Sequence, residues 1–278
     1  MDGIVCVNKP QNMTSFDVIR ILRRKYGVKA GHSGTLDPNA TGLLLIAVNK
    51  GTKALNYIEA EDKVYVGTCT LGLKTDTGDI WGETLQSDTK EIALSKELLD
   101  PIIKSFVKKQ KQRVPMVSAK KINGKKLYEY HRENIEIETQ YTDIEIYDLE
   151  LLDIKENSFT FRAHVSNGTY IRTLCEDLAE ALGTIGTMSA LNRTEIGRFN
   201  LDNAIDLDNL EDELKPIPVK EAVILPKIQD ESLEFKIMNG HRIELDTKED
   251  TVLLDSGKYF AVYGREKGDV FKSIRGLW

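Results

Sequence analysis

The sequence predicts an α+β fold with a mixed, largely antiparallel central sheet flanked by helices. Strand-like and helix-like segments follow one another in an irregular order, without the strict alternation of a parallel α/β protein. Residues 135–154 and 158–165 have the pattern of long antiparallel strands, joined at Glu156 and Asn157. The 278 residues provide one large domain, or one domain with a small appendage.

The elements of the first half follow from apolar spacing and turn residues. Thr14 or Ser15 is a typical N-cap for the next helix, in which Val18, Ile19 and Leu22 recur at helical spacing. Glycines and a proline punctuate the stretch after this helix, which predicts a loop. The expected elements are a strand at 3–7, a helix at 15–26, a loop at 27–42, a buried strand at 43–48, a helix at 52–58, a strand at 63–72 and turns at 74–85.

Two further helices are expected in the second half. Residues 94–107 have a helical pattern despite Pro101. This proline is expected either in the first turn of the helix or at a break in it. Residues 169–182 form an amphipathic helix that ends at Gly183, because glycine is typical of the position after a helix.

A linker is expected where an acidic stretch, residues 206–213, is followed by Pro216 and Pro218. The residues beyond it contain short β-like runs, which predict a small β-rich appendage. We therefore divide the chain into a domain of residues 1–213 and a small domain of residues 214–278.

The charge is unevenly distributed along the chain. The net charge is −6, and residues 200–278, with 11 basic and 17 acidic side chains, account for all of it. The first 199 residues carry two basic clusters, and local potential rather than net charge attracts a polyanion. The clusters therefore either bind a polyanion or form an ordinary solvated face rich in lysine. The clusters are Arg20, Arg23, Arg24, Lys25 and Lys29, and Lys104, Lys108, Lys109, Lys111, Arg113, Lys120, Lys121, Lys125 and Lys126.

Several classes of protein and site are excluded by what the sequence lacks. Its apolar runs are far shorter than the roughly 20 residues of a membrane helix, and an acid stands where a signal peptide is basic. Cys6, Cys69 and Cys175 are far apart, which fits a reducing cytoplasm. The four histidines form no close ligand pair, and no phosphate-binding P-loop occurs. We therefore expect a cytoplasmic protein without a metal site.

The densest motif is the glycine-rich loop of residues 30–44, which contains a single acid, Asp37. Pro38 removes a backbone donor and restricts Asp37 to extended geometry. The pair therefore either holds the Asp37 carboxylate toward a ligand or simply forms a turn. His32, Ser33 and Asp37 also have the residue types of a hydrolase triad. They lie too close together on one loop to form one without a second element.

Two further residues have unusual positions. Arg172 lies in the first turn of a predicted helix, where a cation is unfavourable to the helix dipole, so it is either paired with a buried carboxylate or an ordinary surface arginine. Tyr65 lies in mid-strand on a face with the small residues Gly67 and Cys69. Its ring either stacks on a base over the space these residues leave, or belongs to the core.

The motifs combine into one pattern. In order they are Lys9-Pro10, Met13-Thr14-Ser15, Gly31-His32-Ser33-Gly34-Thr35-Leu36-Asp37-Pro38-Asn39-Ala40-Thr41-Gly42, Lys63-Val64-Tyr65, Ser118-Ala119-Lys120-Lys121, Gly168-Thr169-Tyr170-Ile171-Arg172 and Leu191-Asn192-Arg193-Thr194. Over residues 1 to about 205 this series closely resembles the TruB-type tRNA pseudouridine synthases.

The resemblance implies the pseudouridine synthase fold and the conversion of uridine 55 in the tRNA T-loop to pseudouridine, without a cofactor or metal. It implies that Asp37 is the essential aspartate, Arg172 its partner, and Tyr65 the base-stacking residue and proposed proton acceptor. It further implies that His32 receives the flipped nucleotide and that Leu191 lines the base pocket. The other residues expected at the substrate are Lys9, Lys120, Lys121 and Tyr170.

The resemblance also bears on partners. The basic segment of about residues 104–134 corresponds to the part that closes on the T-arm of tRNA, and residues 214–278 to a PUA-like module. We expect a monomer with no protein partner and no membrane. Val114 and Val117 depart from the family pattern, and this departure affects the expected details of RNA docking rather than the chemistry. Two other functions remain open, a tRNA-folding chaperone and the same chemistry on another RNA stem-loop.

Overall fold

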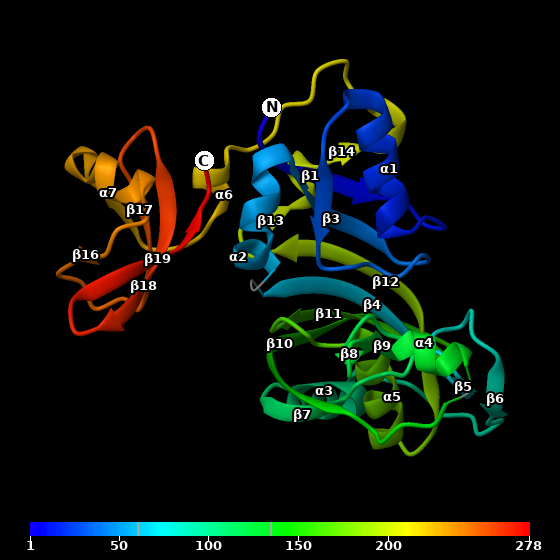
Figure 1. Cartoon of the computed structure of the whole chain (residues 1–278). Helices are drawn as coiled ribbons and strands as arrows, with labels where there is room; N and C mark the ends of the chain where they lie inside the picture. The colour runs from blue at the N-terminus through cyan, green and yellow to red at the C-terminus, as the bar shows by residue number, and fades with distance from the viewer. Residues whose placement is uncertain (60–61, 134) are drawn as a thin grey trace.

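A computed structural model describes residues 1–59, 62–133 and 135–278 of the chain. It confirms the α+β fold class. A large mixed sheet runs through the first two hundred residues, helices pack on it, and a separate five-stranded sheet is built from the C-terminal residues (Figure 1).

The central sheet has the strand order β14-β1-β3-β12-β4-β11-β10-β7, with β2 paired to β3 and β13 to β12. Only β1–β14 and β3–β12 are parallel, so the sheet is largely antiparallel, as expected. Strand β12 lies between β3 and β4 and joins the two halves. The strands are β1 (Gly3–Lys9), β2 (Ala30–Ser33), β3 (Thr41–Val48), β4 (Lys63–Leu71), β7 (Lys109–Arg113), β10 (Tyr141–Lys155), β11 (Ser158–Val165), β12 (Gly186–Ile196), β13 (Phe199–Asn200) and β14 (Ile205–Asp206).

The half of the sheet that contains β1 and β3 is covered on both faces. Helix α1 (Ser15–Tyr26) packs on one face, where Leu44 and Ile46 of β3 point. Helices α2 (Leu55–Glu59) and α6 (Val219–Ala222) and the 3₁₀ helix η1 (Asn49–Ala54) cover the other, where Leu43 and Leu45 point. Burial on both faces explains why the predicted strand at 43–48 has no polar residue.

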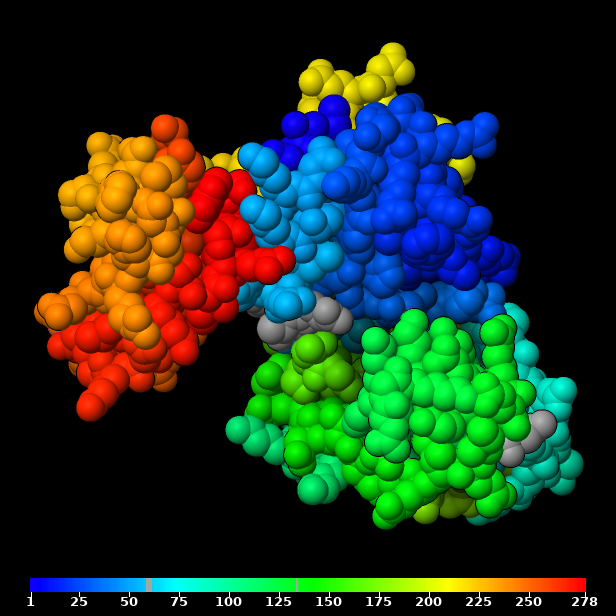
Figure 2. Space-filling view, in the orientation of Figure 1, coloured from blue at the N-terminus to red at the C-terminus, as the bar shows by residue number. Residues whose placement is uncertain are grey.

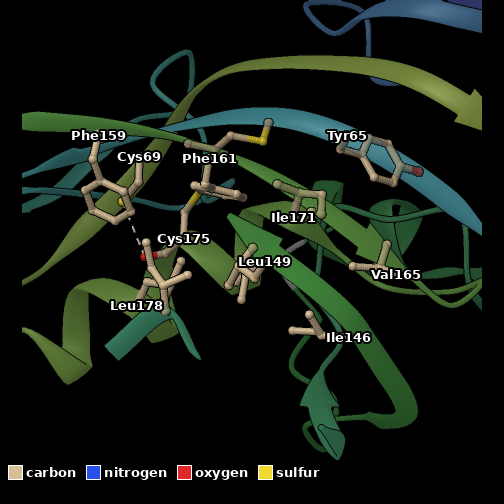
Figure 3. Packing of buried hydrophobic residues seen from close by; sticks show 14 of the residues in the cluster. Tyr65, Cys69, Ile146, Leu149, Phe159, Phe161, Val165, Ile171, Cys175 and Leu178 are labelled. Carbon is tan, nitrogen blue, oxygen red and sulfur yellow. Dashed lines mark hydrogen bonds between the residues drawn. The ribbon is translucent and has the colours of Figure 1, made fainter. Parts of the chain in front are cut away.

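The half that contains β4, β11 and β10 buries one face only, against helices α3 (Lys96–Ser105) and α5 (Ile171–Ala181). Figure 3 shows Phe159 and Phe161 of β11 packed with Cys175 and Leu178 of α5. Helix α3 continues through Pro101 without a break. This core places the first turn of α5 beside the centre of β4.

The ends of helices and strands differ from the sequence predictions in a few places. Thr14, one of the two residues expected, is the N-cap of α1, and it forms a capping box with Asp17. The predicted loop at 27–42 contains β2, because Ala30 to Ser33 pair with the buried strand β3. The strand expected from residue 135 begins at Tyr141. Here the pattern was too weak to show where pairing with β7 starts.

The basic segment of residues 104–134 is divided among several helices and strands. It begins in the last turn of α3, and β7 then forms an edge of the central sheet by pairing with β10. The rest projects as a small hairpin and a short helix, and Asn134 lies outside the described residues. The small elements of the chain's middle are β5 (Leu73–Thr75), β6 (Thr84–Ser87), β8 (Lys121–Ile122), β9 (Lys125–Lys126) and α4 (Leu127–Arg132).

The C-terminal sheet begins at Lys227, after a segment that packs on the first domain. Leu214 is buried in the cluster under α1, and Ile217 exchanges two backbone hydrogen bonds with Ile4 of β1 (2.9 and 2.8 Å). The expected linker is thus packed rather than extended, and the division at residue 213 stays a prediction. The elements are η2 (Leu201–Asn203), η3 (Leu207–Asn209), β15 (Lys227–Gln229), η4 (Glu231–Leu233), α7 (Glu234–Met238), β16 (Ile243–Glu244), β17 (Thr251–Asp255), β18 (Phe260–Lys267) and β19 (Val270–Gly276).

The C-terminal unit stands to one side of the molecule, next to the N-terminal residues and apart from the segment of residues 104–134 (Figure 2). Its last residue is docked, because the Lys53 ammonium donates a hydrogen bond to the Trp278 carbonyl (2.8 Å). Within the described chain, every helix is too short or too polar to cross a lipid bilayer.

Candidate active site

A pocket of about 430 Å³ opens where β4, β12 and the first turn of α5 meet. Its lining comes from five separate stretches of the chain, which the central sheet brings together. The lining residues are Gly34, Thr35, Leu36, Asp37, Lys63, Tyr65, Ser118, Ala119, Lys120, Asn167, Gly168, Thr169, Tyr170, Ile171, Arg172, Leu191 and Arg193.

Asp37 and Arg172 meet in this pocket. The Arg172 Nε lies 3.2 Å from the Asp37 Oδ2, and the arginine side chain is 7% exposed while the aspartate is 40% exposed. Arg172 also donates from Nη1 to the Thr77 carbonyl (2.7 Å) and from Nη2 to the Val117 carbonyl (2.8 Å). The guanidinium is therefore fixed by three acceptors. The carboxylate keeps its charge partner and remains open to a ligand.

The loop that carries Asp37 is braced from below by the N-terminal motifs. Lys9 is fully buried, and its ammonium donates to the carbonyls of Pro10 (2.9 Å), Met13 (2.6 Å) and Pro38 (3.0 Å). The Ser15 hydroxyl donates to the Leu36 carbonyl (3.1 Å) and accepts from the Leu36 N–H (3.0 Å). Both neighbours of Asp37 are thus held by side chains from the first 15 residues.

Lys9 itself is buried rather than exposed to a ligand. Burial lowers its pKa to about 8, although the nearby Asp37 carboxylate partly opposes this change. It is absent from the pocket lining. The structure therefore places Lys9 beneath the loop, where it holds the backbone.

Arg193 is a residue that the sequence interpretation missed. It is 1% exposed and lies on β12, where Nε donates to the Leu43 carbonyl (2.8 Å) and Nη2 to the Gly34 carbonyl (2.9 Å). It fixes the backbone of the loop at Gly34 and Leu43, and it borders the pocket. The available signal was its place in the Leu191-Asn192-Arg193-Thr194 motif, in which Arg193 was given no role; a buried charge needs partners of this kind.

Tyr65 is 8% exposed, and its ring borders the pocket. The space beside Gly67 is not open, which corrects one interpretation of the sequence. A Cβ on Gly67 would lie 3.1 Å from Phe161 Cζ and 3.2 Å from Ile171 Cγ2. The small residue lets α5 approach the sheet, and Figure 3 shows Tyr65 at the end of the cluster that this packing forms.

Tyr170 and Leu191 also line the pocket. Burial raises the pKa of the Tyr170 phenol, while the Ser118 hydroxyl and the Arg172 guanidinium oppose the rise. Lys120 lines the rim and donates to the Tyr141 carbonyl (3.3 Å), whereas Lys121 is exposed on β8 outside the lining.

His32 and Ser33 lie on β2 and are not part of the pocket lining. Ser33 is fully buried. A hydroxyl in that position has no access to a substrate, so a hydrolase triad of His32, Ser33 and Asp37 is ruled out.

Comparisons with known proteins show the family of this chain. Residues 20–171 match the family model described as TruB family pseudouridylate synthase (N terminal domain), and residues 172–226 match the tRNA pseudouridylate synthase B C-terminal domain. A protein of Alkaliphilus oremlandii named tRNA pseudouridine synthase B is 39% identical over 95% of this chain and 90% of its own length. The chain belongs to the TruB family.

Two further relatives of the same name support this membership. The protein from Caldicellulosiruptor saccharolyticus is 36% identical over 99% of this chain and 98% of its own length. The one from Fusobacterium nucleatum is 45% identical over 73% of this chain and 70% of its own length. The TruB family model spans the Asp37 loop, Tyr65 and Tyr170, and the C-terminal model begins at Arg172.

Solved structures show the same fold. The chain titled as part of a Cbf5-Nop10-Gar1 complex superimposes with a TM-score of 0.76, over 99% of this chain and 85% of its own, at 23% identity. At that identity the likeness concerns the fold, which confirms the pseudouridine synthase fold expected from the sequence.

Proposed function

We propose that this TruB family member converts a uridine of tRNA, the T-loop uridine at position 55, to pseudouridine, with Asp37 as the essential carboxylate. The observation that carries the proposal is the half-exposed Asp37 carboxylate in a pocket, paired with the buried Arg172. Relatives that are similar over most of the chain are named tRNA pseudouridine synthase B, which supports tRNA as the substrate.

The reaction is an isomerisation. The N1–C1′ bond of uridine breaks, the uracil turns, and C5 bonds to C1′. The proton on C5 leaves to solvent and N1 gains one, so no redox partner is required. Asp37 either attacks C1′ or removes the C2′ proton, and both steps need an ionised carboxylate. Arg172 favours that ionised form when a bound base excludes water from the pocket.

The target base is reached only after it leaves its stack. Flipping a base out costs a few kcal/mol, and stacking on an aromatic ring returns about 1–3 kcal/mol. Tyr65 and Leu191 border the pocket and are placed to contact the uracil. Lys120 at the rim, with Lys121 and the other cations of residues 104–134, is suited to backbone phosphates of the T-arm.

Release of tritium from tRNA labelled at C5 of uridine tests the proposal. C5 loses its hydrogen whenever it becomes the glycosidic carbon, so wild type should release tritium and Asp37→Asn should not. Asp153→Asn, an exposed acid on β10, is the matched control and should behave as wild type. The product is mapped to locate the modified position.

The other outcomes are informative. Tight tRNA binding without tritium release by wild type would reject the enzyme proposal for this substrate and favour an RNA-folding function. Release that maps to another uridine would reject position 55 while retaining the chemistry.

A further inference from the structure

Gln112 is a buried polar residue that contacts the start of α5. It lies on β7 and is 2% exposed. Its Nε2 donates to the Tyr170 carbonyl (3.0 Å), and its Oε1 accepts from the Tyr170 N–H (2.8 Å). A side-chain amide thus satisfies both backbone groups of one residue, as a neighbouring strand would.

The residue it holds is the N-cap of α5. Tyr170 has extended backbone angles (φ −102°, ψ 111°) and provides no side-chain cap for the helix. The orientation of an uncapped first turn depends on what fixes the residue before it. In this chain Gln112 does so, from a different part of the sheet.

Three more contacts join the end of β7 and the residues after it to the first two turns of α5. The Thr173 hydroxyl donates to the Arg113 carbonyl (3.1 Å), Arg113 forms an ion pair with Glu176, and Arg172 donates to the Val117 carbonyl. This part of the chain therefore contacts residues both before and after Arg172. Of these four side chains, Gln112 is the one that bonds both the N–H and the carbonyl of the residue before the helix.

We propose that Gln112 is a positioning residue, which sets the first turn of α5 and thereby holds the Arg172 guanidinium against Asp37. This inference rests on the proposed function. Arg172 is two residues beyond Tyr170, and its Nε–carboxylate distance of 3.2 Å leaves little room for movement of that turn. A shift of about 1 Å in a positioned group is enough to slow catalysis markedly.

The test is Gln112→Met, which preserves volume and removes both hydrogen bonds. Gln110→Met is the matched control, since Gln110 lies two residues earlier on the same face of β7 and its side chain makes no hydrogen bond within the described residues. Tritium release is measured well below the unfolding temperature of each variant. We expect Gln112→Met to lower kcat about tenfold or more with little change in KM, and Gln110→Met to leave both unchanged.

The readout that separates positioning from general destabilisation is coupling with Arg172. In an Arg172→Lys background, Gln112→Met should lower kcat less than twofold, because the group it positions is already impaired. Gln112→Asn, which keeps the amide but is one methylene too short, repeats the test with a milder change. It should lower kcat in the wild-type background only.

Three results would overturn the inference. They are an unchanged kcat in Gln112→Met and Gln112→Asn, a rise in KM alone, and an equal loss in both Arg172 backgrounds. Failure of the proposed function is seen separately, as the absence of Asp37-dependent release by wild type in the same assay.

Discussion

At the scale of single residues, the site depends on the shape of one guanidinium. Arg172 reaches Asp37, Thr77 and Val117 with three different nitrogens, and these acceptors come from three distant stretches of the chain. The contact to Val117 uses its backbone carbonyl, so the departure from the family pattern at this side chain leaves the contact intact. A guanidinium is needed here, because its donors are spread over three separate nitrogens, whereas the three N–H bonds of an ammonium group leave one atom.

Arg172→Lys should therefore lower kcat by about a hundredfold or more, while tRNA affinity changes little. The lysine keeps the charge but cannot satisfy three diverging acceptors. Arg162→Lys, a half-exposed arginine of β11, is the control. Single-turnover tritium release checks the prediction, and activity within threefold of wild type would show that the charge alone suffices.

Ser15 offers a test of the loop's support. Its buried hydroxyl serves both the N–H and the carbonyl of Leu36, next to Asp37. Ser15→Ala leaves two buried backbone groups without partners, at a cost of about 1–3 kcal/mol in unfolding free energy. We expect this loss in urea denaturation together with a lower kcat, whereas Ser105→Ala, at an exposed position, should change neither.

At the scale of elements, helix α5 carries buried or half-buried charges of opposite sign in successive turns. Its first turn holds the buried Arg172, and one turn later the half-buried acids Glu176 and Asp177 follow. Burial raises the pKa of Asp177 from its usual value near 3.8 to about 6, and the neighbouring Glu176 adds to the rise. At neutral pH the helix therefore contains a carboxylate that is costly to keep charged.

The sign of the pH dependence follows from this shift. Between pH 4 and 6 the folded protein binds more protons at Asp177 than the unfolded chain, so the unfolding free energy falls as pH rises. Asp177→Asn should be more stable than wild type at pH 7.5, by about 1–2 kcal/mol after allowance for partial exposure, with no advantage near pH 4. Denaturation at both pH values checks this, with the exposed Asp153→Asn as control. Equal stability at pH 7.5 would contradict it.

Helices α1, α3 and α5 and strands β1, β3, β4, β10 and β11 could be predicted because their signals are local, whereas β12, which lies between β3 and β4, was not predicted. The capping residues of α1, the apolar run of β3 and the glycine after α5 are each read from a few neighbouring residues. The association of Asp37 with Arg172 came from the family pattern, not from periodicity. The roles of Arg193 and Gln112 were missed, because each depends on hydrogen bonds to backbone groups far away in the sequence. The pattern of a single sequence does not contain that information.

At the scale of the whole molecule, charge separates into two regions. Residues 214–278 carry 11 acidic and 11 basic side chains, so the net charge of −6 lies in the six acids of residues 200–213. The cations of residues 104–126 include Lys120 at the pocket rim and the lysines of the edge strand β7. A polyanion is thus attracted to the side of the molecule that carries the site, whereas the C-terminal unit, with no net charge, adds no net attraction.

This separation predicts the salt dependence of tRNA binding. Replacing Lys120 and Lys121 together by alanine should weaken binding and reduce the slope of log affinity against log salt by roughly one to two. The double replacement of Lys258 and Lys267, both exposed on the C-terminal unit, should leave the slope unchanged. Filter binding over a range of salt concentrations measures both, and equal slopes for the two pairs would contradict the assignment.

The position of β12 has a consequence for biosynthesis. This strand, Gly186–Ile196, lies between β3 and β4 and provides both Leu191 and Arg193, although more than a hundred residues separate it from either neighbour. A nascent chain still lacking it on the ribosome has two half-sheets with open edges and no complete pocket. The pocket around Asp37, a residue encoded near the start of the message, is therefore completed only after about two-thirds of the protein has been translated.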